Sequence, residues 1–179
     1  MKIVILDRDG VINEDSEDFI KSVAEWKPIP GSLEAIARLC HAGYRVFVVS
    51  NQSGIGRGLL DYDALFAIHD RLQRSVAELG GRIDAIEFAP DHPDQPTEMR
   101  KPKPGMLLDL AKRLGVSLDK AHAVGDSLRD VEAARAAGAR PVLVRTGNGA
   151  DTEKKNKDAL KGVPVYDDLA AFAGALLAG

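Results

Sequence analysis

The stretch IVILDRDGVIN, which covers Ile3–Asn13, is the most informative part of the chain. Its first four residues form an unbroken apolar run, and such a run predicts a β-strand that is buried on both faces, as in a parallel sheet. Asp7 and Asp9 follow that run, and Gly10 comes directly after them. Because ligands bind beyond the carboxyl ends of the strands in open α/β sheets, we expect both aspartates to face a functional site.

Four further apolar runs alternate with longer amphipathic stretches along the chain. The runs are Val46–Val49, Ala85–Phe88, Ala121–Val124 and Val142–Val144. The amphipathic stretches predict helices over Ser32–His41, Tyr62–Leu79 and Leu169–Leu177, one that begins at Pro104, and one that opens with the capping sequence Ser127–Asp130. This alternation is typical of the α/β class and predicts a three-layer, Rossmann-like fold, in which helices flank a central parallel sheet. The charged stretch 146–162 is predicted as a surface loop.

Length and composition limit the classes of function. The chain has 179 residues, and at about 100–200 residues per domain we expect a single domain over residues 1–179. Its 24 basic and 27 acidic side chains give a net charge of −3, which does not indicate binding to nucleic acid or to an anionic membrane. Cys40 is the only cysteine, which excludes an intrachain disulfide and a multi-thiolate zinc site and fits a cytoplasmic protein. We expect a monomer that acts on a small molecule.

Polar residues follow the other predicted strands in the same way. Ser50–Ser53 follow the second run, Arg100 and Lys101 follow the third, and Gly125–Asp130 follow the fourth. Because these strand ends meet at one edge of the sheet, Asp126 can join Asp7 and Asp9 in a cage of oxygen ligands of the kind that Mg²⁺ prefers. One carboxylate can attack phosphorus and a second can act as general acid and base, while Ser50 and Lys101 hold phosphoryl oxygens. Each motif alone is more often a turn, a helix cap or a solvated loop, and it is their occurrence in four successive loops that indicates phosphoryl chemistry.

Together these motifs resemble those of the haloacid dehalogenase (HAD) superfamily of phosphatases. That family has a strand followed by D-x-D-G, a strand that ends in Ser or Thr, a Lys, and G-D-x-x-x-D. The matching residues here are Asp7–Gly10, Ser50, Lys101 and Gly125–Asp130. Longer matches over Leu6–Asn13, Ser50–Ile55 and Arg100–Met106 are similar to the group that contains heptose bisphosphate and histidinol phosphate phosphatases.

The resemblance implies a role for each matching residue. Asp7 would be the nucleophile that forms an aspartyl-phosphate, and Asp9 would protonate the leaving oxygen and then activate water. Mg²⁺ would be held by the carboxylates of Asp7 and Asp126 and by the backbone carbonyl of Asp9. Ser50 and Lys101 would hold the transferring phosphoryl group, and the substrate would be bound by Asn51, Gln52, Ser53 and Arg100. For Asp130 two interpretations stay open, because it can either orient the metal site or cap a helix.

The resemblance also implies the reaction. Within this group the chain is most similar to the enzymes that remove the 7-phosphate of a heptose 1,7-bisphosphate, on the route to the nucleotide-activated heptose of lipopolysaccharide core; the preferred anomer stays open. Histidinol phosphate is the alternative substrate. An alternative of another class is a regulatory module with a stable phospho-acceptor aspartate, and Asp9 argues against it because a second carboxylate serves hydrolysis.

One loop departs from the family pattern. Members of this group often hold a structural zinc ion through a C-x-H and a C-x-C, and the matching positions here are Ala89, Asp91, Thr97 and Met99. None of them is Cys or His, so we predict no structural zinc. The loop must then keep its shape by other means.

The segment between Asp9 and Ser32 has room only for a small flap, and we expect no large cap domain. Phe19 and Trp26 lie in this flap, and we expect both to pack on the sheet edge rather than to cover the site.

Overall fold

The computed structural model describes residues 1–179, whose six strands form one parallel sheet in the order β3-β2-β1-β4-β5-β6. The strands are β1 (Ile3–Leu6), β2 (Arg45–Asn51), β3 (Ala85–Ala89), β4 (His122–Gly125), β5 (Arg140–Val144) and β6 (Val165–Tyr166). The five predicted strands are confirmed, and the short β6 adds a sixth at one edge. The central strand β1 lies between β2 and β4, with Leu6 opposite Val48 on one side and Val124 on the other. The chain order reverses at β1, so the crevice beyond β1 and β4 is the expected place for a ligand.

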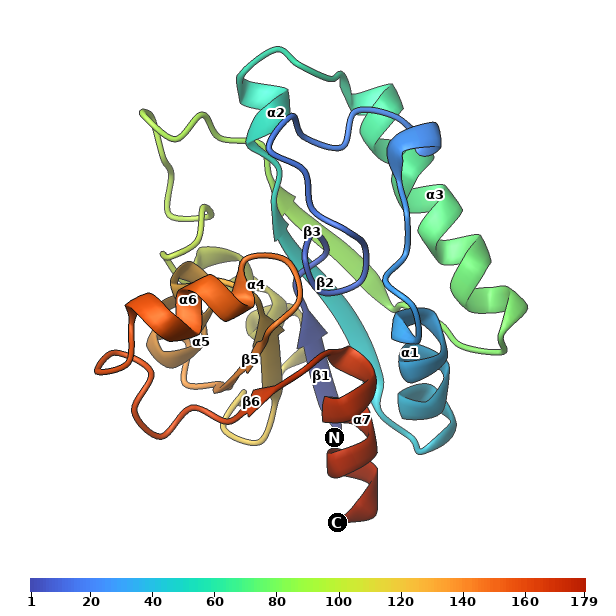
Figure 1. Cartoon of the computed structure of the whole chain (residues 1–179), viewed down its shortest axis with the longest axis vertical. Helices are drawn as coiled ribbons and strands as arrows, with labels where there is room; N and C mark the ends of the chain where they lie inside the picture. Colours follow the sequence, from blue (N-terminus) through green and yellow to red (C-terminus); the bar gives the residue numbers. More distant parts are fainter.

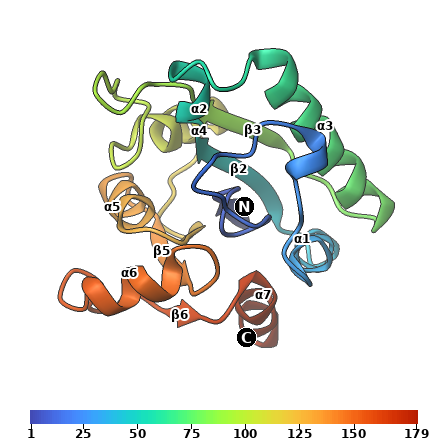
Figure 2. The ribbon, with the colours of Figure 1, turned by 45° about the horizontal axis from the view of Figure 1, so that its top comes forward.

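Helices cover both faces of this sheet. The helices α1 (Ser32–His41), α3 (Tyr62–Glu78) and α7 (Leu169–Ala178) lie on one face, and α4 (Gly105–Leu114) and α5 (Leu128–Ala136) lie on the other (Figures 1 and 2). Alternate residues of β1 serve the two cores, since Val4 and Leu6 pack with the first set of helices while Ile3 and Ile5 pack with the second. The predicted three-layer α/β fold is therefore confirmed.

Side chains at the helix starts set the helix boundaries. Asp61 accepts a hydrogen bond from the backbone N–H of Ala64 and caps α3. Ser127 and Asp130 form the predicted capping box at the start of α5. The prediction for α4 is wrong by one residue, because the Pro104 carbonyl accepts the first helical hydrogen bond and Pro104 is thus the cap rather than the first helical residue.

The prediction of a surface loop over residues 146–162 is wrong in part, because α6 (Gly149–Lys155) lies within it. Two turns of helix are too short to produce a clear amphipathic period. Tertiary contacts hold this helix instead, since the buried Thr152 hydroxyl donates to the Asp126 carbonyl across 3.0 Å. Two further single-turn elements, α2 (Ser53–Gly56) and η1 (Val23–Glu25), carry no sequence signal of this kind.

The flap after β1 returns to the sheet and adds no separate layer. Trp26 is buried in the core that faces α1 and α3, as expected. The expectation for Phe19 is wrong, because its ring lines the cavity at the sheet edge described below. No helix of the chain combines the length and the apolar character needed to cross a membrane.

Candidate active site

All nine predicted site residues line one cavity of about 180 Å³ at the carboxyl edge of the sheet. They are Asp7, Asp9, Ser50, Asn51, Gln52, Ser53, Arg100, Lys101 and Asp126. They come from the ends of β1, β2 and β4 and from the loop after β3, so the topology brings together residues that lie far apart in the sequence. The cavity is mostly polar, with Phe19, Ile20 and Leu60 as its apolar lining.

Three carboxylates crowd the floor of this cavity. Oxygen atoms of Asp7, Asp126 and Asp130 all lie within 4.8 Å of one another. Burial, followed by the charge of Asp130, raises the pKa of Asp7 to about 7, and burial together with the charge of Asp7 raises the pKa of Asp126 to about 8. A nearby cation would therefore favour the ionised form of both carboxyl groups at neutral pH. Hard carboxylate oxygens in a polar cavity fit Mg²⁺ in this respect.

Lys101 supplies one positive charge inside the cluster. Its ammonium group lies 2.6 Å from Asp130 Oδ1 and 3.1 Å from Asp7 Oδ1, and it also donates to the Val49 carbonyl across 2.8 Å. Burial opposes the charge, but the two carboxylates outweigh it and raise the pKa of Lys101 above its ordinary value. Lys101 is therefore a fixed cation beside Asp7 in the cavity, where it could hold an anionic group.

Asp130 caps α5, which confirms one of the two interpretations that the sequence left open, and it also pairs with Lys101. Its Oδ1 accepts from Lys101, and its Oδ2 accepts from the backbone N–H groups of Asp126 and Ser127 and from the Ser127 hydroxyl. These donors occupy both oxygens. Asp7 and Asp126 are the other two carboxylates of the cluster and could hold a metal ion, while Asp130 pairs with Lys101 and caps α5.

Two glycines leave room for the Asp126 carboxylate. A Cβ atom on Gly10 would lie 2.1 Å from Asp126 Oδ2, and one on Gly147 would lie 2.4 Å from the same oxygen. Both residues also have positive φ angles, of 83° and 57°, which side chains disfavour. The backbone N–H of Asn148 donates to Asp126 Oδ2 across 2.8 Å. The loop after β5 therefore helps to build the site, although the sequence offered no role for Asn148.

Asn51, the last residue of β2, and Gln52, which follows it, brace other members of the site. Asn51 pairs both ends of its amide with the Lys101 backbone, at 3.0 Å each, and so fixes the loop that carries the lysine. The Gln52 amide donates to Ser50 Oγ at 2.8 Å and to Asp9 Oδ2 at 3.1 Å. Ser50 is buried and lines the cavity. Direct contacts of Asn51, Gln52 and Ser53 with substrate stay predictions.

The rim of the cavity carries a group of arginines. Arg100 and Arg129 line it, and Arg57 lies over the ring of Phe19, 5.5 Å from its centre. Burial, and then the charges of Arg129 and Arg57, lower the pKa of Arg100. One buried nitrogen of Arg100 has no hydrogen-bond partner. The charge of Asp91 offsets part of this repulsion, and the remaining positive charge of the rim could bind an anion.

Comparisons with known proteins place this chain among phosphatases. A family model described as HAD-hydrolase-like matches residues 98–172. The D-glycero-β-D-manno-heptose-1,7-bisphosphate 7-phosphatases of Pseudomonas aeruginosa and Bordetella bronchiseptica are 53% and 51% identical to it; the matches cover 98% and 99% of this chain and 97% and 98% of those proteins. The chain belongs to the heptose-1,7-bisphosphate 7-phosphatase family.

Solved structures agree with membership in this heptose-bisphosphatase family. The crystal structure of D,D-heptose 1,7-bisphosphate phosphatase from B. bronchiseptica, complexed with magnesium and phosphate, matches with a TM-score of 0.97 at 51% identity and covers 99% of both chains. The enzyme from Burkholderia thailandensis matches with a TM-score of 0.79 at 46% identity over 100% of both chains. The resemblance to HAD phosphatases is therefore confirmed.

A hydrogen-bonded clasp lies where the family resemblance placed zinc ligands. The backbone N–H and the hydroxyl of Thr97 both donate to Asp91 Oδ2, each across 2.6 Å. Burial works against the charge of Asp91, but these hydrogen bonds prevail and hold the pKa of Asp91 below its usual range. The clasp therefore joins Asp91 and Thr97, which are two of the four positions that match the zinc ligands of related proteins.

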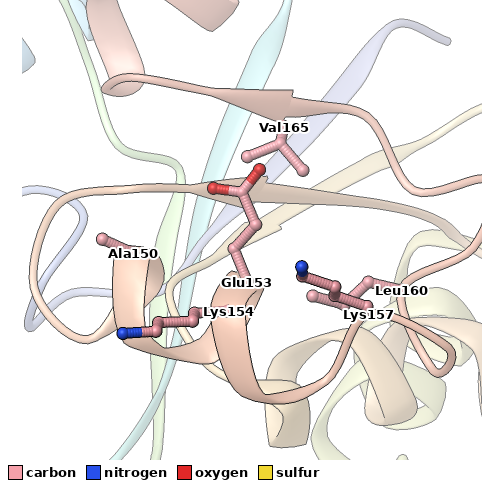
Figure 3. A pocket seen from close by; sticks show the side chains of 6 residues that line it. All are labelled: Ala150, Glu153, Lys154, Lys157, Leu160 and Val165. Atoms are coloured by element: carbon pink, nitrogen blue, oxygen red, sulfur yellow. The ribbon is translucent and has the colours of Figure 1, made fainter.

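A second, larger hollow of about 490 Å³ lies between α6 and β6, away from the carboxylates (Figure 3). Its acidic side chain, Glu153, is already paired with Arg145 through two hydrogen bonds. The remaining lining consists of Ala150, Lys154, Lys157, Leu160 and Val165. This hollow therefore lacks the groups for phosphatase chemistry of the heptose-bisphosphatase family.

Proposed function

We propose that this chain is a Mg²⁺-dependent phosphatase that removes the 7-phosphate of D-glycero-β-D-manno-heptose 1,7-bisphosphate through an aspartyl-phosphate intermediate. The observation that carries the proposal is the convergence of Asp7, Asp9, Lys101 and Asp126 in one cavity. Relatives that are 50–53% identical over nearly the whole chain carry this activity in their names and support the substrate and the β anomer.

The first chemical step uses two carboxylates in different roles. An Asp7 oxygen forms a bond to phosphorus while the bond from phosphorus to the sugar oxygen breaks, and the proton of Asp9 passes to that oxygen. Lys101 and Ser50 hold the oxygens of the transferring phosphoryl group. A magnesium ion held by the carboxylates of Asp7 and Asp126 and by the Asp9 carbonyl would neutralise phosphoryl charge.

The second step restores the enzyme. Water attacks the phosphorus of the aspartyl-phosphate, Asp9 accepts the proton of that water, and inorganic phosphate leaves as the Asp7 carboxylate is regenerated. A stable phospho-acceptor would not need Asp9. Hydrogen bonds from Asn13 and Gln52 hold the Asp9 carboxylate at the cavity, which supports hydrolysis over the regulatory alternative.

The arginine rim supports a bisphosphate over histidinol phosphate. The charges of Arg57 and Arg129 lower the pKa of Arg100. An anion bound among these three side chains would relieve their repulsion. The second phosphate of a heptose bisphosphate supplies that anion. Histidinol phosphate instead carries an amine, which the same rim would repel. We propose that this rim binds the phosphate that is not transferred.

We further propose that residues 1–179 work as one phosphatase domain, as a cytoplasmic monomer without nucleic-acid or membrane partners. The net charge of −3 supports the absence of nucleic-acid and anionic-membrane partners, because it gives no net attraction to such polyanions.

Trapping the intermediate tests the mechanism. The Asp9→Asn variant should still attack an aryl phosphate, whose leaving group needs no proton, but should hydrolyse the aspartyl-phosphate slowly. Mass spectrometry should then find one phosphoryl group on Asp7. A wild-type chain that itself keeps the phosphoryl group for hours would instead support the regulatory module, and phosphate on no aspartate in either protein would contradict the covalent mechanism.

A further inference from the structure

Arg8, between the two aspartates of the D-x-D-G motif, is a completely buried cation. The exposed fraction of Arg8 is 0%, and burying a charge is costly unless the charge is paired and hydrogen-bonded. Its Nε donates to Asp9 Oδ1 across 2.9 Å, and its Nη2 lies 2.8 Å from the same oxygen without an aligned hydrogen bond. The guanidinium therefore contacts Oδ1 of Asp9, the proposed general acid, through two of its nitrogens.

The other end of Arg8 contacts a histidine on a different element. Arg8 Nη1 lies 3.3 Å from Nε2 of His69, a residue of α3 that is 7% exposed. Arginine can only donate, so Nε2 must accept and the imidazole must be neutral, with its proton on Nδ1. Burial and the charge of Arg8 lower the pKa of His69 to about 4, which agrees with a neutral ring. The ring of Phe88 on β3 packs 5.9 Å from the imidazole and holds it in place.

This arrangement treats the two oxygens of Asp9 differently. Oδ1 receives Arg8 Nε and the Asn13 amide, at 2.9 Å each, together with the Arg8 Nη2 contact. Oδ2 receives a single bond of 3.1 Å, from Gln52. A proton on Oδ1 would displace donors that are already in place, whereas Oδ2 accepts only the Gln52 hydrogen bond, and Asp9 lines the cavity. The proton that Asp9 transfers therefore belongs on Oδ2.

We propose that Arg8 and His69 are positioning residues for proton transfer: His69 anchors the Arg8 guanidinium, which holds Oδ1 of Asp9 so that Oδ2 faces the leaving oxygen. This inference rests on the proposed phosphatase function. In the first step the proton moves from Oδ2 to the sugar oxygen as the phosphorus–oxygen bond breaks. In the second step Oδ2 takes the proton of the attacking water. Neither Arg8 nor His69 gains or loses a proton.

Leaving-group dependence separates this role from a structural one. A sugar alkoxide is a poor leaving group and needs the proton of Asp9, whereas nitrophenolate leaves without it. Loss of the His69 contact should therefore slow aspartyl-phosphate formation from the sugar phosphate but not from p-nitrophenyl phosphate. Loss of folded protein or of the metal site would slow both equally.

The test compares His69→Leu, which removes the acceptor, with His69→Gln, which can keep it through its side-chain oxygen. Rapid mixing with Mg²⁺ measures the first turnover of heptose 1,7-bisphosphate and the first release of nitrophenolate. Since general acid catalysis contributes about 10²–10⁴-fold, we expect His69→Leu to lose about tenfold or more with the sugar substrate and less than about twofold with the aryl one. His69→Gln should stay within about threefold of wild type on both. Ile68→Val, a core change one position away in α3, is the matched control and should leave the ratio of the two rates unchanged.

His69→Phe fills the volume of the imidazole ring but has no acceptor for Arg8. It replaces His69→Leu in the comparison if the leucine variant does not fold. Equal slowing of both substrates by His69→Leu or His69→Phe, or no slowing of either, would overturn the positioning role while the phosphatase function stands. A wild-type chain that hydrolyses neither substrate would overturn the proposed function itself, and the positioning role with it.

Discussion

Replacing Asp7 with asparagine tests whether the crowded carboxylates of the site destabilise the metal-free fold. The pKa of Asp7 is about 7 in the folded chain, against 3.8 as the ordinary value. Between these two values the folded chain binds more protons than the unfolded chain. Its free energy of unfolding therefore falls as the pH rises from about 4 to about 7, and stays low above that. Asparagine has nearly the same shape without the charge, so Asp7→Asn should be more stable than wild type at pH 8.

The size of the effect follows from the pKa shift. At 1.36 kcal/mol per pKa unit, a rise from 3.8 to about 7 corresponds to about 4 kcal/mol at most. Asp126 shares the same repulsion, so the effect of one substitution should be about half of that limit. We expect the stability advantage of Asp7→Asn to grow by about 2 kcal/mol between pH 5 and pH 8. His69, whose pKa is lowered to about 4, works in the opposite direction below its ordinary 6.5, but it is present in both proteins and cancels in the difference.

Urea unfolding in excess chelator, at pH 5 and at pH 8, measures this difference. Asp63→Asn makes the same chemical change at an exposed position in the first turn of α3, and its difference from wild type should not grow with pH. Excess Mg²⁺ should reverse the order at pH 8, because the wild-type carboxylates gain binding energy that the variant has partly lost. A variant that is less stable than wild type at pH 8 without metal would refute the reasoning that burial and carboxylate repulsion make the ionised Asp7 destabilising.

Three other substitutions have distinct expected results. Lys101→Met should lower kcat by about 10²–10³-fold with KM changed much less, in steady-state assays of phosphate release, because it removes the cation that faces the phosphoryl group. Arg129→Ala should raise KM for the bisphosphate about tenfold but leave KM for p-nitrophenyl phosphate within twofold, since only the bisphosphate reaches the rim; equal changes in both would contradict a rim site. Thr97→Val should speed amide hydrogen exchange in residues 91–97 about tenfold and leave global unfolding within about 0.5 kcal/mol, because it removes one of two hydrogen bonds to Asp91; unchanged exchange would argue against the clasp.

Local sequence features were sufficient to predict most of the fold. Apolar runs such as Ile3–Leu6 are long enough to identify buried strands, and Ser127–Asp130 encodes its own helix cap. The exceptions are short elements. The helix α6 is held by contacts such as the Thr152 hydroxyl on the Asp126 carbonyl, which connects positions 26 residues apart and leaves no local periodic signal.

The candidate site was predicted as a set of residues but not as a network. The HAD-like motifs identify Asp7, Asp9 and Lys101 because each follows a strand. Nothing local pairs Arg8 with His69, which lie 61 residues apart and meet only when α3 packs on the sheet. Asp130 had two separate interpretations from sequence: the structure confirms the helix cap, whereas a role in orienting the metal site stays a prediction.

The measurement that tests the central claim most directly is phosphate release from the two anomers of heptose 1,7-bisphosphate and from histidinol phosphate, with Mg²⁺ and with chelator, by the wild type and by Asp7→Asn. We expect Mg²⁺-dependent release with the highest kcat/KM for the β anomer, loss of the phosphate at position 7 by phosphorus NMR, and no turnover by the variant. Higher kcat/KM for histidinol phosphate would contradict the assigned substrate. Equal turnover by Asp7→Asn would contradict the assigned nucleophile.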